Sequence, residues 1–203
     1  AMASQPLIWM QRAPMEFNEV ASMAMELLVA PYLTKEKGGL FTSAEAARHR
    51  IGHLEKIILF MPYMAVVDSF QHWLYTHIDA AKEAAARDAK WDELWQRFMP
   101  QIDWQGYEQI RSGGWHRKLH IFRYPFYYIE YGMAQIGALQ LWRNSLDDHA
   151  QALADYRHAL SLGGTKDLAA LFAAAGAEFR FDTPFISELV NLIEATIDEL
   201  QTE

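Results

Sequence analysis

The feature that most constrains this chain is a helical spacing of apolar residues that continues through almost all of its 203 positions. Apolar side chains recur three and four residues apart, and no stretch of useful length alternates as a β-strand does. Prolines and glycines divide the pattern into separate segments. We therefore predict an all-α fold, an irregular multi-helix arrangement that forms a single domain over residues 1–203.

Several helix boundaries can be predicted from local signals. The segment MEFNEVASMAMELLVA follows Pro14 and predicts a helix that stops near Pro31. Thr42 and Glu45 match a capping box, which predicts the start of a long helix that Pro62 should kink or interrupt. The segment 99–119 is expected to be irregular. Further helices are expected over residues 80–98, over 125–143 and from 184 onward, with shorter ones before the last.

The composition excludes several classes of protein. Hydrophobic residues make up 51% of the chain and charged residues 22%, which is enough to bury a core and argues against disorder. Cysteine is absent, so disulfides and thiolate metal sites are excluded. The net charge of −8, without a lysine and arginine cluster, argues against nucleic acid as a partner. We find no signal peptide or membrane-spanning run, and expect a cytoplasmic protein with no membrane partner.

The stretch HRIGH contains two histidines, His49 and His53, at the spacing that zinc peptidases use in their H-E-x-x-H motif. Arg50 stands where that motif has its glutamate. A guanidinium cannot accept a proton from water, and its charge would repel Zn²⁺. We interpret HRIGH as polar residues on a half-exposed helix, with a metal site as the less favoured alternative.

Two carboxylates, Glu19 and Glu26, lie in the otherwise apolar stretch FNEVASMAMELL. Seven residues are about two helical turns, so both side chains are expected on the same side of the helix. Carboxylates on a mostly buried face need a metal, basic residues or a hydrogen-bond network as partners. The alternative is two charges on the solvent side of an amphipathic helix.

A second stretch, HIFRYPFYYIEY, places His120 and four tyrosines within twelve residues. On a helix, one side would be lined by Tyr124, by Tyr127 or Tyr128, and by Tyr131. Buried tyrosines need partners for their hydroxyl groups, and a cleft that binds peptides or stabilises an oxyanion provides them. The alternative is an aromatic stripe in the core.

Five segments in order resemble the C-terminal half of the catalytic domain in the oligoendopeptidase F and thimet oligopeptidase family of zinc peptidases. The resemblance covers almost the whole chain. In this sequence the segments read PMEFNEVASMAMELL, FMPYMAVVDSFQHWLY, LHIFRYPFYYIEYGMAQIGALQLW, LSLGGT and LFAAAGAEF.

The resemblance implies roles for individual residues. Glu19 opens the motif whose glutamate binds zinc in the family, and Glu26 would orient a histidine that binds the metal. The implied catalytic residues are His120, Tyr128 and Tyr131, and a register shift of one residue would exchange Tyr128 for Tyr127. The residues implied to contact the substrate are Tyr124, Tyr127, Gly113 and Gly114, with the glycines in a mobile loop beside the cleft.

The chain departs from the family in one respect. Family members take two zinc ligands and the general base from an H-E-x-x-H helix that precedes the glutamate motif, but the eighteen residues before Glu19 contain no histidine. The sequence therefore supplies one of the three expected ligands. Zinc is expected as a cofactor only when the missing helix is supplied.

We expect the chain to be a fragment of a zinc-dependent oligopeptidase that hydrolyses bonds in short peptides, and to be inactive alone. Two alternatives stay open. The chain is either a noncatalytic helical module that binds peptides or a partner protein, or one half of a two-chain peptidase. The expected partners are short peptides, and the N-terminal part of the same enzyme or a second copy of the chain.

Overall fold

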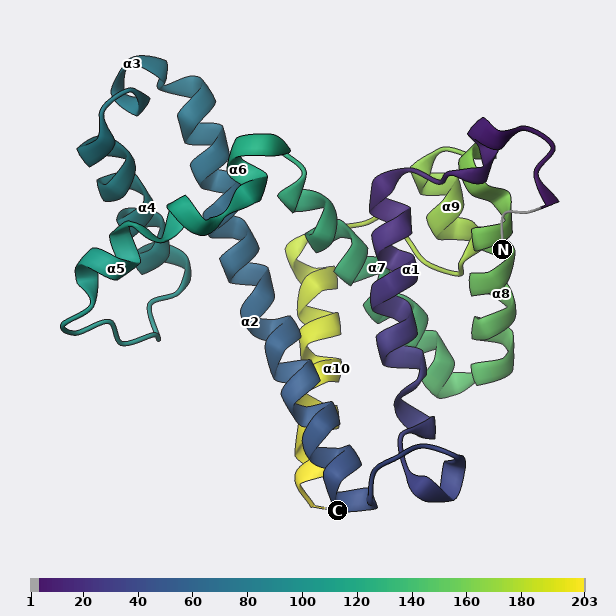
Figure 1. Cartoon of the computed structure of the whole chain (residues 1–203). Helices are drawn as coiled ribbons and strands as arrows, with labels where there is room; N and C mark the ends of the chain where they lie inside the picture. The colour runs from purple at the N-terminus through teal and green to yellow at the C-terminus, as the bar shows by residue number, and fades with distance from the viewer. Residues whose placement is uncertain (1–3, 203) are drawn as a thin grey trace. The chain divides into compact units, whose positions relative to one another are not determined.

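The computed structural model describes residues 4–202, and these residues fold into ten α-helices joined by short turns (Figure 1). No β-strand occurs within residues 4–202, where the only bridge pairs Thr34 with Phe41. The prediction of an all-α fold is confirmed.

The helix bounds follow the sequence pattern closely at both ends of the chain and less closely in its middle. They are α1 Met15–Leu28, α2 Ser43–Thr76, α3 Ile78–Ala81, α4 Ala84–Phe98, α5 Glu108–Ser112, α6 Leu119–Arg123, α7 Tyr128–Asp147, α8 His149–Leu162, α9 Leu168–Ala174 and α10 Thr183–Gln201. Short 3₁₀ helices cover Ile8–Gln11, Ala30–Tyr32, Lys35–Lys37, Gly114–Arg117 and Gly163–Thr165.

The chain divides into two compact units, each with its own packed interior. The first unit comprises Ala1–Ile57 and Met133–Glu203, and the second comprises Ile58–Gly132. Helices α2 and α7 each contribute residues to both units. The expectation of a single domain over residues 1–203 stays a prediction.

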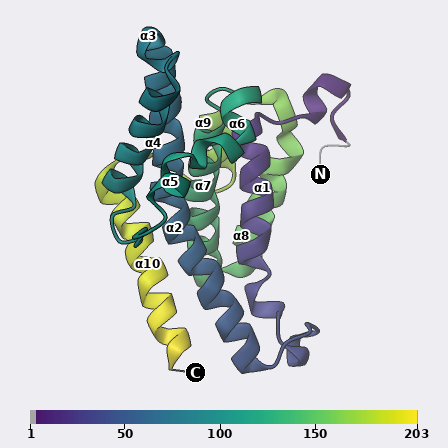
Figure 2. The same ribbon diagram turned by 60° about the vertical axis from the view of Figure 1, so that its left-hand side comes forward.

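In the first unit, α1 presents one apolar face to α8 and α9. Phe17, Val20 and Ala24 recur at helical spacing and are fully buried. The Phe17 ring lies 6.0 Å from that of Phe172 in α9. The Tyr156 hydroxyl, on α8, donates a 2.8 Å hydrogen bond to a carbonyl of α1, and the two helices run close together in a second view (Figure 2).

Helix α7 joins the first unit through close packing and a buried amide. Gly137 lies so close to its neighbours that a Cβ there would come within 2.8 Å of Phe172 and 3.0 Å of Val20. The fully buried Gln140 amide donates to the Glu178 carbonyl at 3.0 Å and accepts from the Glu178 amide at 2.7 Å. Because both hydrogen-bonding groups of this side chain are paired, it fixes the segment before α10 without a desolvation penalty.

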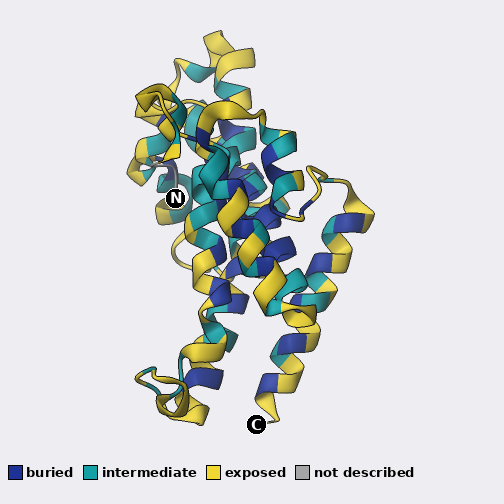
Figure 3. Ribbon diagram, turned by 90° about the vertical axis from the view of Figure 1, so that its right-hand side faces the viewer, coloured by how far each residue is buried: buried dark blue, intermediate teal, exposed yellow. Residues whose placement is uncertain are grey.

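Helix α10 is amphipathic along its whole length. Its N-cap, Asp182, accepts a 3.2 Å hydrogen bond from the Phe185 amide. Figure 3 shows buried positions recurring along the helix that ends at the C-terminus. Neither α10 nor any other helix in residues 4–202 is long and apolar enough to cross a membrane. The buried residues are Phe185, Leu189, Ile193, Thr196 and Leu200.

The start of α2 is confirmed. Pro62 does not interrupt the helix, and the alternative of a kink there stays a prediction. The Thr42 amide donates to a Glu45 carboxylate oxygen at 2.8 Å, and the Glu45 amide reaches the Thr42 hydroxyl at 3.3 Å. Helix α2 is continuous over Ser43–Thr76, with Pro62 inside it. Proline removes one backbone donor there, and the turns that follow bury Val66 and Val67 completely.

The second unit is built around aromatic side chains. Trp91, Leu94 and Trp95 lie on one face of α4 and are buried. Phe70 meets Trp91 edge to face at 5.2 Å. The single helix expected over residues 80–98 is divided in two. At the break, the Arg87 guanidinium donates to the carbonyls of Ala81 and Lys82 at 2.6 and 3.0 Å.

Candidate functional site

His120 and the four tyrosines of HIFRYPFYYIEY lie together in the second unit. His120 belongs to α6, and α7 begins only at Tyr128. Between them, Phe126 adopts a left-handed backbone conformation with φ of 61°. A non-glycine residue there costs on the order of 1–3 kcal/mol, and such strain is frequent at functional sites. This turn, and not one continuous helix face, folds the tyrosines back onto His120.

All four tyrosine rings surround the imidazole. The distances from the His120 ring centroid are 5.1 Å to Tyr128, 5.7 Å to Tyr131, 6.0 Å to Tyr127 and 6.4 Å to Tyr124. The Tyr127 ring is stacked on the imidazole, with an angle of 9° between the planes. The Tyr131 hydroxyl lies 3.5 Å from His120 Nε2. The structure therefore brings together every aromatic residue that the sequence singled out in this stretch.

Lys118 completes this cluster, and the sequence analysis missed it. Its Nζ donates a 3.1 Å hydrogen bond to the Tyr128 hydroxyl oxygen. The same ammonium lies over the rings of Tyr63 and Tyr128, 4.6 and 4.8 Å from their centroids. Because the lysine occupies an acceptor position of the phenol oxygen, the Tyr128 O–H is left to act as a donor.

Burial sets the charge state of the cluster. It raises the pKa of Tyr128 far above its ordinary value, and the neighbouring Tyr63 and Tyr131 raise it further. Burial also lowers the pKa of Lys118, with Arg117 adding to the effect. The pKa of His120 is lowered by burial and then by the charge of Lys118. At neutral pH the cluster therefore combines the protonated phenol of Tyr128 with an uncharged imidazole, and this phenol can donate a hydrogen bond to a carbonyl oxygen or an oxyanion.

Gly113 and Gly114 line a cavity to which neither His120 nor the four tyrosines contribute. This cavity measures about 220 Å³, and its other walls include Trp91, Trp95 and Trp104. A Cβ on Gly114 would come within 3.0 Å of the Trp91 indole nitrogen, so glycine allows the backbone to approach this ring closely. Their expected contact with a peptide stays a prediction.

The two carboxylates on α1 belong to the first unit. Glu19 is partly buried, and the Ser22 hydroxyl lies 3.5 Å from one of its carboxylate oxygens. Glu26 is exposed, and its carboxylate lies 3.1 Å from His53 Nε2. That Glu19 and the tyrosines around His120 line one cleft stays a prediction.

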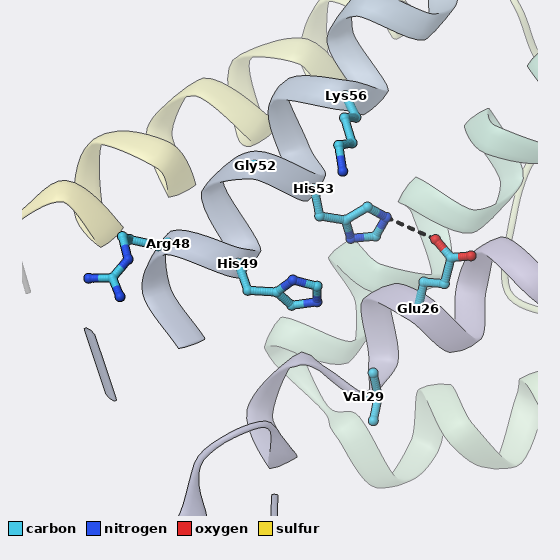
Figure 4. Close-up of a pocket in the computed structure, with 7 residues that line it drawn as sticks. All are labelled: Glu26, Val29, Arg48, His49, Gly52, His53 and Lys56. Atoms are coloured by element: carbon cyan, nitrogen blue, oxygen red, sulfur yellow. Dashed lines mark ion pairs between the residues drawn. The ribbon is translucent and has the colours of Figure 1, made fainter. Parts of the chain in front are cut away.

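Figure 4 shows that Glu26 and the HRIGH stretch, two separate features of the sequence, meet in one pocket. The pocket measures about 520 Å³. His49 and His53 project from the same side of α2, and His53 points at Glu26. The His49 ring lies 5.4 Å from that of Phe41. The pocket is lined by Glu26, Val29, Arg48, His49, Gly52, His53 and Lys56.

These side chains do not amount to a metal centre. Within the described residues 4–202, no three histidine, aspartate or glutamate side chains are placed to hold a metal ion together. A catalytic zinc needs three protein ligands. Neither Glu19 by itself nor the pair of Glu26 with His53 meets that requirement, so the described residues do not fit a complete zinc site.

The fold of the chain is similar to those of solved peptidase structures. The structure of PZ peptidase A with inhibitor 2 superposes with a TM-score of 0.83 at 32% identity, covering 93% of this chain and 32% of that one. A structure described as an oligoendopeptidase F superposes with a TM-score of 0.81 at 31% identity, covering 92% of this chain and 32% of that one. A third structure, described as an oligoendopeptidase F from Bacillus anthracis str. Ames, superposes with a TM-score of 0.73 at 28% identity. The match covers 93% of this chain and 29% of that one.

The chain thus spans about a third of the length of these structures. No match was found among curated protein sequences. The sequence matches the family described as peptidase family M3 over residues 1–191, which confirms the resemblance stated from its five segments. Members of this family are in general zinc metallopeptidases. By sequence and by fold, the chain belongs to peptidase family M3.

Proposed function

We propose that these residues carry the substrate-facing part of a zinc-dependent oligopeptidase that hydrolyses peptide bonds in short peptides. The observation that carries the proposal is the arrangement around His120, where tyrosine rings surround an imidazole and Lys118 leaves the Tyr128 O–H available as a donor. Membership of a peptidase family supports the same activity.

In this proposal the hydroxyls of Tyr128 and Tyr131 donate hydrogen bonds to the carbonyl oxygen of the bond to be cleaved. As that oxygen gains negative charge, the hydrogen bonds strengthen, which favours the transition state over the bound substrate. His120 holds the Tyr131 hydroxyl in place through their 3.5 Å contact. Tyr124, which is 52% exposed, and the stacked Tyr127 contact the peptide on either side.

Glu19 supplies one zinc ligand, and Glu26 orients a histidine that binds the metal. The two histidine ligands and the general base come from polypeptide outside these 203 residues, either the N-terminal part of the same enzyme or a separate chain. Residues 4–202 contain no group of three side chains placed to hold a metal ion, which supports the proposal that the other ligands come from elsewhere.

A reconstitution experiment tests the proposal. The purified chain is mixed with zinc and with the part of an oligoendopeptidase F that contains its H-E-x-x-H helix, and cleavage of an internally quenched peptide is followed. We expect cleavage only when both polypeptides are present. Tyr128→Phe should lower kcat by about 10²-fold or more, because one oxyanion donor is lost.

Tyr107→Phe is the matched control, since Tyr107 is 61% exposed and lies outside the cluster. An assembled complex that does not cleave peptides, or in which the two substitutions act alike, would contradict the proposal.

Peptide binding without hydrolysis is the second candidate function. It is favoured by the completeness of the tyrosine cluster within the second unit, which needs no metal for its geometry. In that case short peptides bind to the chain alone, Tyr128→Phe weakens their binding, and no cleavage follows when the H-E-x-x-H segment is added.

A further inference from the structure

Three tryptophans of the second unit form the wall of the 220 Å³ cavity. Trp91 and Trp95 come from α4, with ring centroids 6.3 Å apart. Trp104 meets Trp95 edge to face at 5.5 Å. The cavity is far larger than the roughly 10–15 Å³ that a single water requires. It is smaller than the roughly 300–1,000 Å³ of pockets for drug-sized ligands, so a ligand here has about the size of one amino-acid residue.

The indole N–H groups of all three tryptophans lack hydrogen-bond partners. The nitrogens of Trp91, Trp95 and Trp104 are buried, and no acceptor lies within reach of them in the described residues. The neighbouring Trp115 shows the usual arrangement, since its indole donates a 2.8 Å hydrogen bond to Asp88. Buried donors without partners are rare, and three of them belong to the side chains that form this wall.

The charged residues of the wall determine what kind of ligand fits. No carboxylate lines the cavity, whereas Arg111, His116 and Arg117 do. Arg111 is already neutralised by Asp92, with contacts of 2.6 and 3.2 Å. Arg117 is exposed and has no carboxylate partner among residues 4–202. Tryptophan faces alone would attract an organic cation, but the unneutralised charge of Arg117 disfavours one.

We propose that this cavity binds a carboxylate carried on a small apolar body. The carboxylate pairs with Arg117, and the apolar body packs against the tryptophan rings and Ile110. Both a free organic acid and the C-terminal residue of a peptide offer this chemistry. The proposal does not depend on peptide cleavage, because binding is measured on the chain alone without zinc.

Indole NMR signals report on this binding directly. The chain contains seven tryptophans, and each ¹⁵N-indole signal is assigned with its own Trp→Phe variant. The labelled chain is titrated with 4-methylpentanoate and, as a neutral control of the same shape, with 4-methylpentanamide. We expect the acid to shift the signals of Trp91, Trp95 and Trp104 with a Kd of about 1 mM or tighter, while Trp115 and Trp142 stay unchanged. The amide should bind at least about tenfold more weakly.

A second pair of probes identifies the source of the ligand. Acetyl-Ala-Leu is compared with its C-terminal amide in the same titration. If the peptide acid binds as tightly as the free acid or more so, the cavity recognises peptide C-termini. If only 4-methylpentanoate binds, it recognises free acids.

Two substitutions separate the site from general charge effects. Arg117→Gln should weaken acid binding about tenfold or more. Arg97→Gln is the matched control, since Arg97 lies over Phe98 and does not line the cavity. Equal shifts by acid and amide, shifts at all indoles, or equal effects of the two arginine substitutions would overturn the proposal.

Discussion

Replacing Lys118 by methionine tests the reasoning about the tyrosine cluster. The substitution keeps an unbranched side chain but removes the ammonium that donates to Tyr128 at 3.1 Å and lies over the Tyr63 ring at 4.6 Å. A hydrogen bond that involves a charged group contributes roughly 1.5–3 kcal/mol, and a cation–π contact adds about 0.5–2 kcal/mol. Part of this is offset because burying the ammonium is unfavourable, as the lowered pKa of Lys118 indicates. We therefore expect a net loss of about 1–2 kcal/mol in the free energy of unfolding.

The assay is urea denaturation followed by near-ultraviolet circular dichroism, which reports on the ordered aromatic side chains around Lys118. Lys166→Met serves as the control, because Lys166 is exposed, and its effect should stay within about 0.5 kcal/mol. If Lys118→Met changes the free energy of unfolding no more than the control does, the ammonium does not hold Tyr128, and the orientation argued for its hydroxyl is refuted.

Two further predictions concern packing and pH. Gly137→Ala should destabilise the fold, because overpacking against Phe172 costs about 1–3 kcal/mol and exceeds the gain in helix propensity. Gly52→Ala should stabilise the fold by up to about 1 kcal/mol, because a Cβ at this position would meet nothing within 4 Å. Urea denaturation of both variants measures the two changes in the free energy of unfolding. The pKa of His120 is lowered in the folded state, so just below the ordinary value of about 6.5 the unfolded chain binds more protons than the folded chain. The contribution of the neutral His120 to the free energy of unfolding is therefore fully present above that pH. It is lost as the pH falls through the folded pKa. Unfolding measured from pH 7 to pH 5 should show this decline, and His120→Gln should flatten it.

The parts of the fold that could be predicted are those determined by neighbours in the sequence. The helix after Pro14 and the capping box at Thr42 and Glu45 follow from local spacing, and both are present. At the break between α3 and α4, carbonyls accept hydrogen bonds from the Arg87 guanidinium, a contact that helical spacing does not reveal. Pro62 failed to interrupt α2 because burial of the turns that follow it outweighs one missing backbone hydrogen bond.

In the candidate site too, residue types could be predicted from the sequence, but the contacts between distant residues could not. The tyrosines near His120 could be selected by residue type, but the turn that assembles them depends on the left-handed conformation of Phe126, which nothing in the sequence indicates. Lys118 belongs to no motif, so its contact with Tyr128 became visible only in the structure. The pairing of Glu26 with His53 joins residues from different helices, and helical spacing cannot predict contacts of that kind.

The central claim is that the metal centre is shared, with Glu19 supplied by this chain and the other ligands by polypeptide outside it. Zinc affinity measured near neutral pH, with the chain alone and after addition of an H-E-x-x-H segment, tests this most directly. We predict negligible binding to the chain alone, tight one-to-one binding to the mixture, and marked weakening by Glu19→Gln, whereas His53→Ala leaves the affinity unaltered. Tight one-to-one binding to the chain alone, or binding to the mixture that Glu19→Gln does not change, would contradict the account.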